Sequence, residues 1–125
     1  MRLLLDTHMF LWSVLGSRRL PGKAKALIQE AEEVFVSAAS LWEIAIKTRL
    51  GRLDADPQDL LQAIPESGFL ELPITARHAA QVERLPDHHR DPFDRILISQ
   101  AMVEPLRLVT ADAQLSLYTD LVLHF

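Results

Sequence analysis

The sequence contains no cysteine and only four glycines among its 125 residues. Without cysteine the chain forms neither disulfides nor thiolate metal sites, and a reducing compartment suits it. There is no His-Glu-x-x-His pattern, and no glycine-rich run that could cradle a phosphate group. These absences exclude a disulfide framework, a zinc-protease helix and a phosphate-binding glycine loop.

Long apolar runs and excess positive charge are also missing. No stretch approaches the ~20 apolar residues of a membrane span, and Asp6 and His8 break the apolar run near the amino terminus. We therefore expect a cytoplasmic protein with no membrane association. A net charge of -4 argues against holding nucleic acid by bulk electrostatics, and the basic cluster around Arg19 is interpreted as a solvated face. With 49% hydrophobic residues, residues 1–125 are predicted to form a single domain.

Strand and helix patterns alternate along the chain, without repeats or linkers. Strands are predicted at residues 3–5, 34–36, 69–72, 107–110 and 121–124. Helices are predicted at about residues 10–15, 23–33, 38–50, 57–64, 76–85, 92–103 and 111–118. This alternation predicts an α/β fold, a three-layer α/β/α sandwich with a five-stranded parallel sheet.

Four acidic residues fall where such a sheet would bring them together. Asp6 follows the first strand and Asp112 the fourth, Glu43 lies on the helix after the second strand, and Asp94 in the first turn of the helix before the fourth. Because the carboxyl ends of parallel strands share one edge of the sheet, residues far apart in sequence can meet there.

Each acid also has a purely structural interpretation. Asp6 and Asp112 are suited to cap helices, and Asp91 to cap the helix whose first turn holds Asp94. Glu43 and Lys47, four residues apart, are spaced for an ordinary helix ion pair. The adjacent histidines 88 and 89 lie in a polar loop and are interpreted as solvated or structural.

The apolar surroundings favour a shared role for the acids. Asp6 follows three leucines, and Glu43 lies on a strongly apolar helix. Carboxylates crowded together in such places raise each other's pKa, and a divalent cation relieves the repulsion. Oxygen-only ligation suits Mg²⁺ or Mn²⁺, and such a site supports phosphoryl transfer or phosphodiester hydrolysis.

Four sequence blocks resemble a known family. They are Asp6-Thr7-His8 with Leu11-Trp12; Ser37 to Ser40 with Leu41-Trp42-Glu43-Ile44 and Lys47; His89-Arg90-Asp91-Pro92-Phe93-Asp94-Arg95; and Thr110-Ala111-Asp112 with Tyr118. In order and spacing they resemble the PIN-domain ribonucleases, specifically the VapC-type toxins of bacterial toxin-antitoxin pairs. The resemblance covers nearly the whole chain.

The resemblance implies a PIN-like fold and an endoribonuclease dependent on Mg²⁺ or Mn²⁺. Its catalytic and metal-binding carboxylates would be Asp6, Glu43, Asp94 and Asp112. Of the two acids in the third block, Asp94 takes the family position before Arg95, and Asp91 is left as a cap.

Other residues and partners are implied in the same way. Thr7 and Thr110 would support the carboxylates or contact a phosphate, and Lys47 or Arg95 would assist at the substrate. The partners would be an RNA substrate, a second copy of the chain in a homodimer, and a cognate antitoxin protein covering the acidic groove. The alternative is a catalytically silent PIN-fold module that binds RNA or protein. A signalling receiver or a dehalogenase-like phosphatase would need a second acid directly after Asp6 or two residues beyond it, where the chain has Thr7 and His8.

Overall fold

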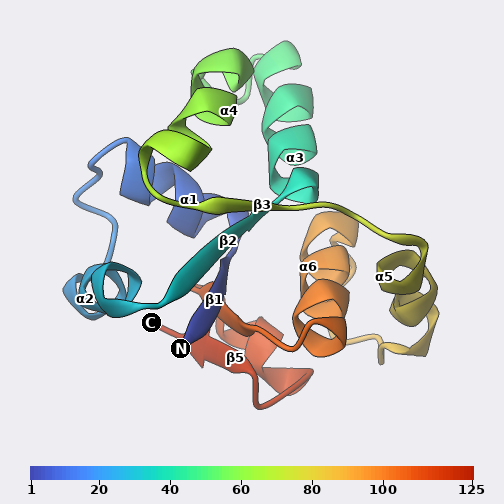
Figure 1. The fold of residues 1–125 in the computed structure, drawn as a ribbon. Helices are drawn as coiled ribbons and strands as arrows, with labels where there is room; N and C mark the ends of the chain where they lie inside the picture. Colours follow the sequence, from blue (N-terminus) through green and yellow to red (C-terminus); the bar gives the residue numbers. More distant parts are fainter.

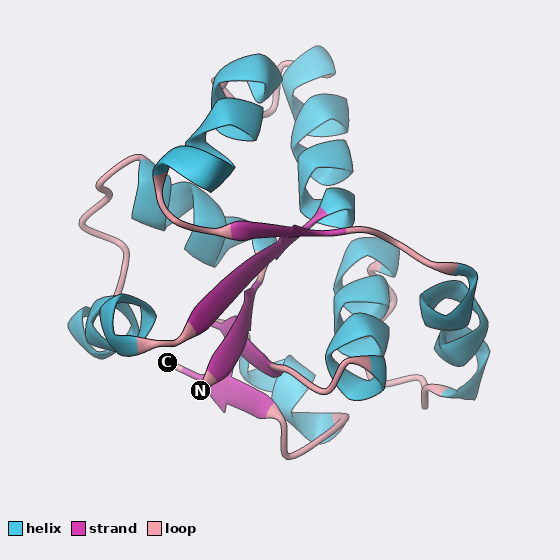
Figure 2. Ribbon diagram, in the orientation of Figure 1, coloured by secondary structure: helices cyan, strands magenta, loops and turns pink.

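The computed structural model describes residues 1–125 and contains one parallel sheet (Figures 1 and 2). Its strands are β1 (Arg2–Leu5), β2 (Glu33–Ser37), β3 (Leu70–Leu72), β4 (Arg107–Thr110) and β5 (Val122–His124). They lie in the order β3-β2-β1-β4-β5, and all four neighbouring pairs are parallel. The predicted five-stranded parallel sheet is therefore confirmed.

Six α-helices and two short 3₁₀ helices connect the strands. The α-helices are α1 (Thr7–Val14), α2 (Gly22–Glu30), α3 (Ala38–Arg49), α4 (Pro57–Glu66), α5 (Ala76–Gln81) and α6 (Pro92–Val103). The 3₁₀ helices are η1 (Val82–Arg84) and η2 (Ala113–Leu117). Two expected α-helices thus differ: residues 76–85 divide into α5 and η1, and residues 111–118 form only η2. Both changes fall in short connections, where 3₁₀ turns are common.

The alternation of side chains along β1 creates two separate apolar cores. Leu3 and Leu5 pack with residues of α1, α2 and α4, whereas Leu4 packs on the opposite face with residues of α6 and η2. All three leucines are completely buried. Figure 1 shows α1, α2 and α4 on one side of the sheet and α5 and α6 on the other. The predicted three-layer α/β/α sandwich is confirmed.

The strand order fixes where a site can form. From the central β1 the chain moves outward through β2 and β3, then returns to the other side of β1 for β4 and β5. The direction of winding therefore reverses between β1 and β4, and open α/β sheets bind ligands in the crevice that this reversal leaves at the carboxyl ends of the strands. Asp6 and Asp112 both lie just past this edge, after β1 and β4.

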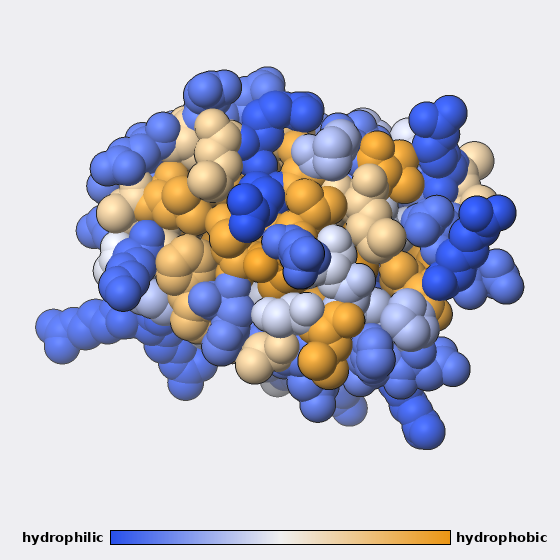
Figure 3. All heavy atoms as spheres, turned by 90° about the horizontal axis from the view of Figure 1, so that it is seen from below, coloured by the Kyte–Doolittle hydropathy of each residue, from blue (hydrophilic) through white to orange (hydrophobic).

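The outer surface is mixed in character. In Figure 3, which looks at the molecule from below Figure 1, apolar side chains gather across the middle of the face and hydrophilic ones surround them. None of the α-helices has both the length and the apolar character needed to cross a membrane.

Candidate metal centre

A hollow of about 460 Å³ opens at the carboxyl edge of the sheet, and we call it the acidic hollow. Its lining residues come from both sides of the β1–β4 crevice and from α3 and α6: Asp6, Thr7, His8, Trp12, Arg19, Glu43, Lys47, Asp91, Asp94, Ala111, Asp112 and Ala113. The structure thus brings all four predicted carboxylates together, and adds Asp91 as a fifth.

Asp6 is both a helix cap and a member of the cluster. Its Oδ1 accepts a hydrogen bond from the backbone N–H of Met9 at 2.8 Å and so caps α1. Its Oδ2 accepts a hydrogen bond from Thr110 Oγ1 at 2.6 Å. Burial raises the pKa of Asp6 above 3.8, although these two hydrogen bonds oppose the change. The capping and site interpretations are compatible, because each carboxylate oxygen can accept more than one partner.

Glu43 is held just as closely. Its side chain is buried on α3, where Thr7 Oγ1 donates to Oε1 at 2.6 Å and Lys47 Nζ donates to Oε2 at 2.6 Å. The expected helix pair with Lys47 is therefore present, and it places one cation on the wall of the acidic hollow. Thr7 and Thr110 each hold a carboxylate, and Thr110 is fully buried.

Asp94 and Asp91 begin α6 side by side. Asp91 Oδ1 accepts hydrogen bonds from the backbone N–H groups of Phe93 at 2.8 Å and Asp94 at 3.3 Å, which is the expected cap. Burial, followed by repulsion from Asp91 and Asp6, raises the pKa of Asp94 from 3.8 to about 7. The surroundings of Asp94 therefore disfavour its ionised form when no cation is bound.

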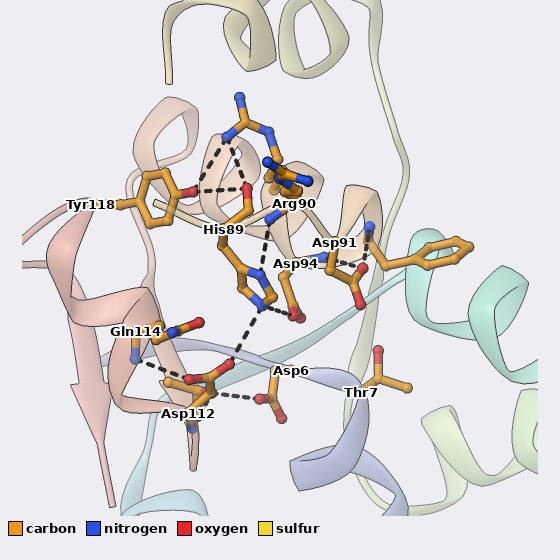
Figure 4. A network of polar contacts seen from close by, with 12 residues as sticks. Asp6, Thr7, His89, Arg90, Asp91, Asp94, Asp112, Gln114 and Tyr118 are labelled. Atoms are coloured by element: carbon orange, nitrogen blue, oxygen red, sulfur yellow. Dashed lines mark hydrogen bonds and ion pairs between the residues drawn. The ribbon is translucent and has the colours of Figure 1, made fainter. Parts of the chain in front are cut away.

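His89 joins the cluster, which the sequence reasoning missed (Figure 4). Its Nε2 lies 3.0 Å from Asp94 Oδ2 and 3.5 Å from Asp112 Oδ2. Its Nδ1 accepts a hydrogen bond from the backbone N–H of Arg90 at 3.0 Å, so a neutral ring carries its proton on Nε2 and donates it to the acids. The histidine pattern itself gave no signal; only its position five residues before Asp94 did.

Asp112 completes the edge of the hollow from β4. Its Oδ1 accepts from the backbone N–H of Gln114 at 2.9 Å and caps η2, while its own backbone N–H donates to Thr110 Oγ1 at 3.0 Å. Thr110 thereby connects Asp112 to Asp6 through one hydroxyl group. These hydrogen bonds link the carboxyl ends of β1 and β4 beside Asp6 and Asp112.

Arg95 does not reach the acidic hollow. Its guanidinium donates hydrogen bonds to the hydroxyl group of Tyr118 and to several backbone carbonyls, which belong to Val82, Leu85, Pro86 and His89. These bonds fix the loop that carries His89. The geometry therefore gives Arg95 a structural role, and its expected contact with substrate stays a prediction. Arg19, interpreted as part of a solvated face, lines the hollow instead.

The donor set fits a hard divalent cation. Five carboxylates line one hollow, and burial and mutual repulsion raise the pKa of two of them. Lys47 pairs with Glu43, and His89 Nε2 lies near Asp94 and Asp112. His89 and these last two acids also form a group whose ligand atoms lie within 4.8 Å of one another. Carboxylate oxygens held in place before binding suit Mg²⁺ or Mn²⁺.

Fold and site together define a class: α/β/α proteins whose carboxylates converge at the switch point of a parallel sheet. The sequence pattern of the PIN domain matches residues 3–121, and the chain belongs to the PIN-domain family. Over 121 residues it is 31% identical to Ribonuclease VapC22 of Mycobacterium tuberculosis, covering 90% of this chain and 88% of that one. The resemblance to VapC-type proteins is thus confirmed.

Two solved structures share the fold. VapBC2 from Rickettsia felis, bound to a DNA fragment from its promoter, has a TM-score of 0.73 and 17% identity, covering 99% of this chain and 98% of that one. A toxin-antitoxin complex from Klebsiella pneumoniae has a TM-score of 0.68 and 20% identity, covering 97% and 95%. At these identities the likeness concerns the fold alone.

Proposed function

We propose that the chain is an endoribonuclease dependent on Mg²⁺ or Mn²⁺ and acts as the toxin of a toxin-antitoxin pair. The observation that carries the proposal is the acidic hollow, in which carboxylates from four separate segments converge with too few cations to neutralise them. The relatedness to a VapC ribonuclease supports the choice of RNA as the substrate.

The chain's own residues would hold the cation and the substrate. Asp6, Glu43, Asp94 and Asp112 would bind the metal. Thr110 and Thr7 fix Asp6 and Glu43 by hydrogen bonds of 2.6 Å, so the ligands need little rearrangement. When bound, a divalent cation neutralises charge that develops on a phosphodiester and makes water a stronger acid. Lys47 lies on the wall of the hollow and is positioned to contact a phosphate oxygen.

The shape of the site favours RNA that is not paired. An open hollow of about 460 Å³ admits a splayed strand, whose unstacked bases are free, more readily than a closed duplex. We further propose that residues 1–125 act as one domain, as a homodimer, and that an antitoxin protein covers the acidic hollow. Solved relatives are toxin-antitoxin complexes, which supports the antitoxin partner.

Cleavage of a mixed pool of labelled RNAs by the purified protein tests the function. We expect cutting with Mg²⁺ or Mn²⁺, none with EDTA, and none by Asp6→Asn or Asp94→Asn variants that still fold. Asp54→Asn is the matched control, because Asp54 is exposed and lines neither the acidic hollow nor its neighbours. Equal cutting by the two site variants would refute the proposed site. No cutting by a folded, metal-binding wild type would favour the silent binding module.

A further inference from the structure

A second hollow adjoins the acidic one and differs from it in charge. Its volume is about 310 Å³, and it shares three lining residues with the acidic hollow: Thr7, His8 and Lys47. No carboxylate lines it, and it adds the cation Arg52. We call it the basic hollow, after Lys47 and Arg52. The shared residues form the boundary between the two hollows, so one extended strand can occupy both.

The end of α3 places the two cations together. Gly51 has φ +72°, in the left-handed region that favours glycine, and its N–H donates to the Thr48 carbonyl at 3.1 Å. The N–H of Arg52 then donates to the carbonyl of Lys47 at 2.9 Å. This pair of bonds is the Schellman motif that ends helices, and it ties the backbone of Arg52 to that of Lys47. The local sequence thus places the guanidinium group of Arg52 in the same hollow as the ammonium group of Lys47.

Arg52 is free to bind a ligand. Its side chain is exposed and enters neither an ion pair nor a side-chain hydrogen bond, its single recorded bond being that of its backbone N–H to Lys47. Lys47, in contrast, already pairs with Glu43. The uncompensated charge in the basic hollow is therefore that of Arg52, and a guanidinium is well suited to phosphate oxygens.

Apolar and aromatic side chains also line the basic hollow. The apolar ones are Leu11, Ile44 and Leu53. His8 is exposed at the boundary, and its ring lies 5.7 Å from that of Trp12, which lines the acidic hollow. Aromatic rings beside a cationic groove are the usual features that bind unpaired bases.

We propose that the basic hollow binds the nucleotide next to the scissile phosphodiester of single-stranded RNA, with its base against His8 and its phosphate on Arg52. The inference rests on the proposed function and deepens it, because the acidic hollow alone would repel an RNA chain. The basic hollow supplies the attraction that holds the strand while its neighbouring phosphate lies among the carboxylates.

The test measures RNA affinity in an Asp94→Asn background, which keeps the RNA intact. Fluorescence anisotropy with short labelled single-stranded RNAs of mixed sequence is recorded over a range of salt concentrations. Arg52→Gln is expected to weaken binding roughly fivefold and to lower the slope of log Kd against log salt by about 0.7, the share of one phosphate contact. His8→Ala is expected to weaken binding about tenfold with no change in that slope, since a base contact carries no charge.

Arg49→Gln is the matched control. Arg49 is exposed in the last turn of α3 and lines neither hollow, and its substitution removes the same charge as Arg52→Gln. It is expected to leave both affinity and salt slope unchanged. Thermal melting is expected to be the same for all variants, because none of the three side chains makes a hydrogen bond or ion pair.

The outcomes separate this inference from the proposed function. If the wild type cuts RNA but Arg52→Gln binds with unchanged affinity and slope, the subsite is refuted and the nuclease stands. An equal loss in Arg49→Gln would also refute it, because bulk charge would then explain the effect. If Arg52→Gln weakens binding of polyglutamate and not of RNA, the basic hollow docks an acidic protein segment and the proposal is overturned. If the wild type neither binds nor cuts RNA, both proposals fall.

Discussion

Removing the charge of Asp94 is expected to stabilise the metal-free protein at neutral pH. The folded-state pKa of Asp94 is raised from 3.8 to about 7, chiefly by burial and by repulsion from Asp91. A raised pKa means that the folded state holds its proton longer than the unfolded state does. The stability that the protonated carboxyl contributes is complete below about pH 4 and is lost as the pH rises through 7.

The size of the effect follows from the shift. Each pKa unit corresponds to about 1.4 kcal/mol, so ionised Asp94 lowers the free energy of unfolding by up to about 4 kcal/mol at pH 8 in the absence of metal. That is a large part of the stability of an ordinary domain, which is about 5–15 kcal/mol. Asp94→Asn has no charge to bury and is expected to be more stable than the wild type at pH 8 by a few kcal/mol.

Urea denaturation in EDTA at pH 5 and pH 8 measures the difference. The stability of the wild type is expected to fall between these pH values more steeply than that of Asp94→Asn, and Mn²⁺ to restore the wild type while leaving the variant unchanged. Asp54→Asn, which removes an exposed carboxylate, is expected to follow the wild type. Parallel pH dependence in the wild type and Asp94→Asn would refute the assignment of strain to this carboxylate.

Substitutions at three further positions test the residues that hold the two hollows and the His89 loop in place. Asp6→Asn keeps the hydrogen bond from Met9 that caps α1, and Asp6→Ala loses it. The free energy of unfolding in urea is therefore expected to be about 1 kcal/mol lower for the alanine variant. Calorimetry is expected to find no Mn²⁺ binding in either variant. Gly51→Ala places a side chain at φ +72° and is expected to lower the free energy of unfolding by about 1 kcal/mol, measured in urea; no loss would contradict the helix-end geometry. Arg95→Gln leaves loop carbonyls unpaired and is expected to cost about 2 kcal/mol and to speed amide hydrogen exchange in residues 82–89. Unchanged exchange there would show that Arg95 does not hold the loop.

β1 could be predicted from the sequence because it is an unbroken apolar run with a fixed end. Leu3 to Leu5 face two cores, which requires a strand covered on both sides, and Asp6 stops the run by capping α1. In a parallel sheet the carboxyl ends of the strands share one edge, so Asp6 and Asp112, which directly follow their strands, are expected at that edge. Local spacing and one topological rule were therefore enough to bring these acids together.

The loop contributions could not be predicted in the same way. His89 approaches Asp94 because Arg95, from the following helix, holds the loop through several carbonyls. No local pattern around His89 encodes such bonds. The loop that carries Arg19 likewise gains its place in the acidic hollow only when α1 and α2 are packed. The resemblance implies that Arg95 assists at the substrate, whereas its guanidinium group binds Tyr118 and the loop carbonyls in this structure.

The pairing of β1 with β4 has a consequence for how the protein is made. Asp6 leaves the ribosome 104 residues before Thr110, whose hydroxyl group donates a hydrogen bond to the second carboxylate oxygen of Asp6. Until β4 has been released, β1 lacks one of its two neighbouring strands. Asp6 then also lacks the hydroxyl group of Thr110 that orients it, and the neighbouring acid Asp112. A growing chain therefore has no complete acidic hollow until Asp112 has been released. In a nascent chain shorter than that, the acids that follow β1 and β4 have not met, and the acidic hollow that carries the proposed function has not formed.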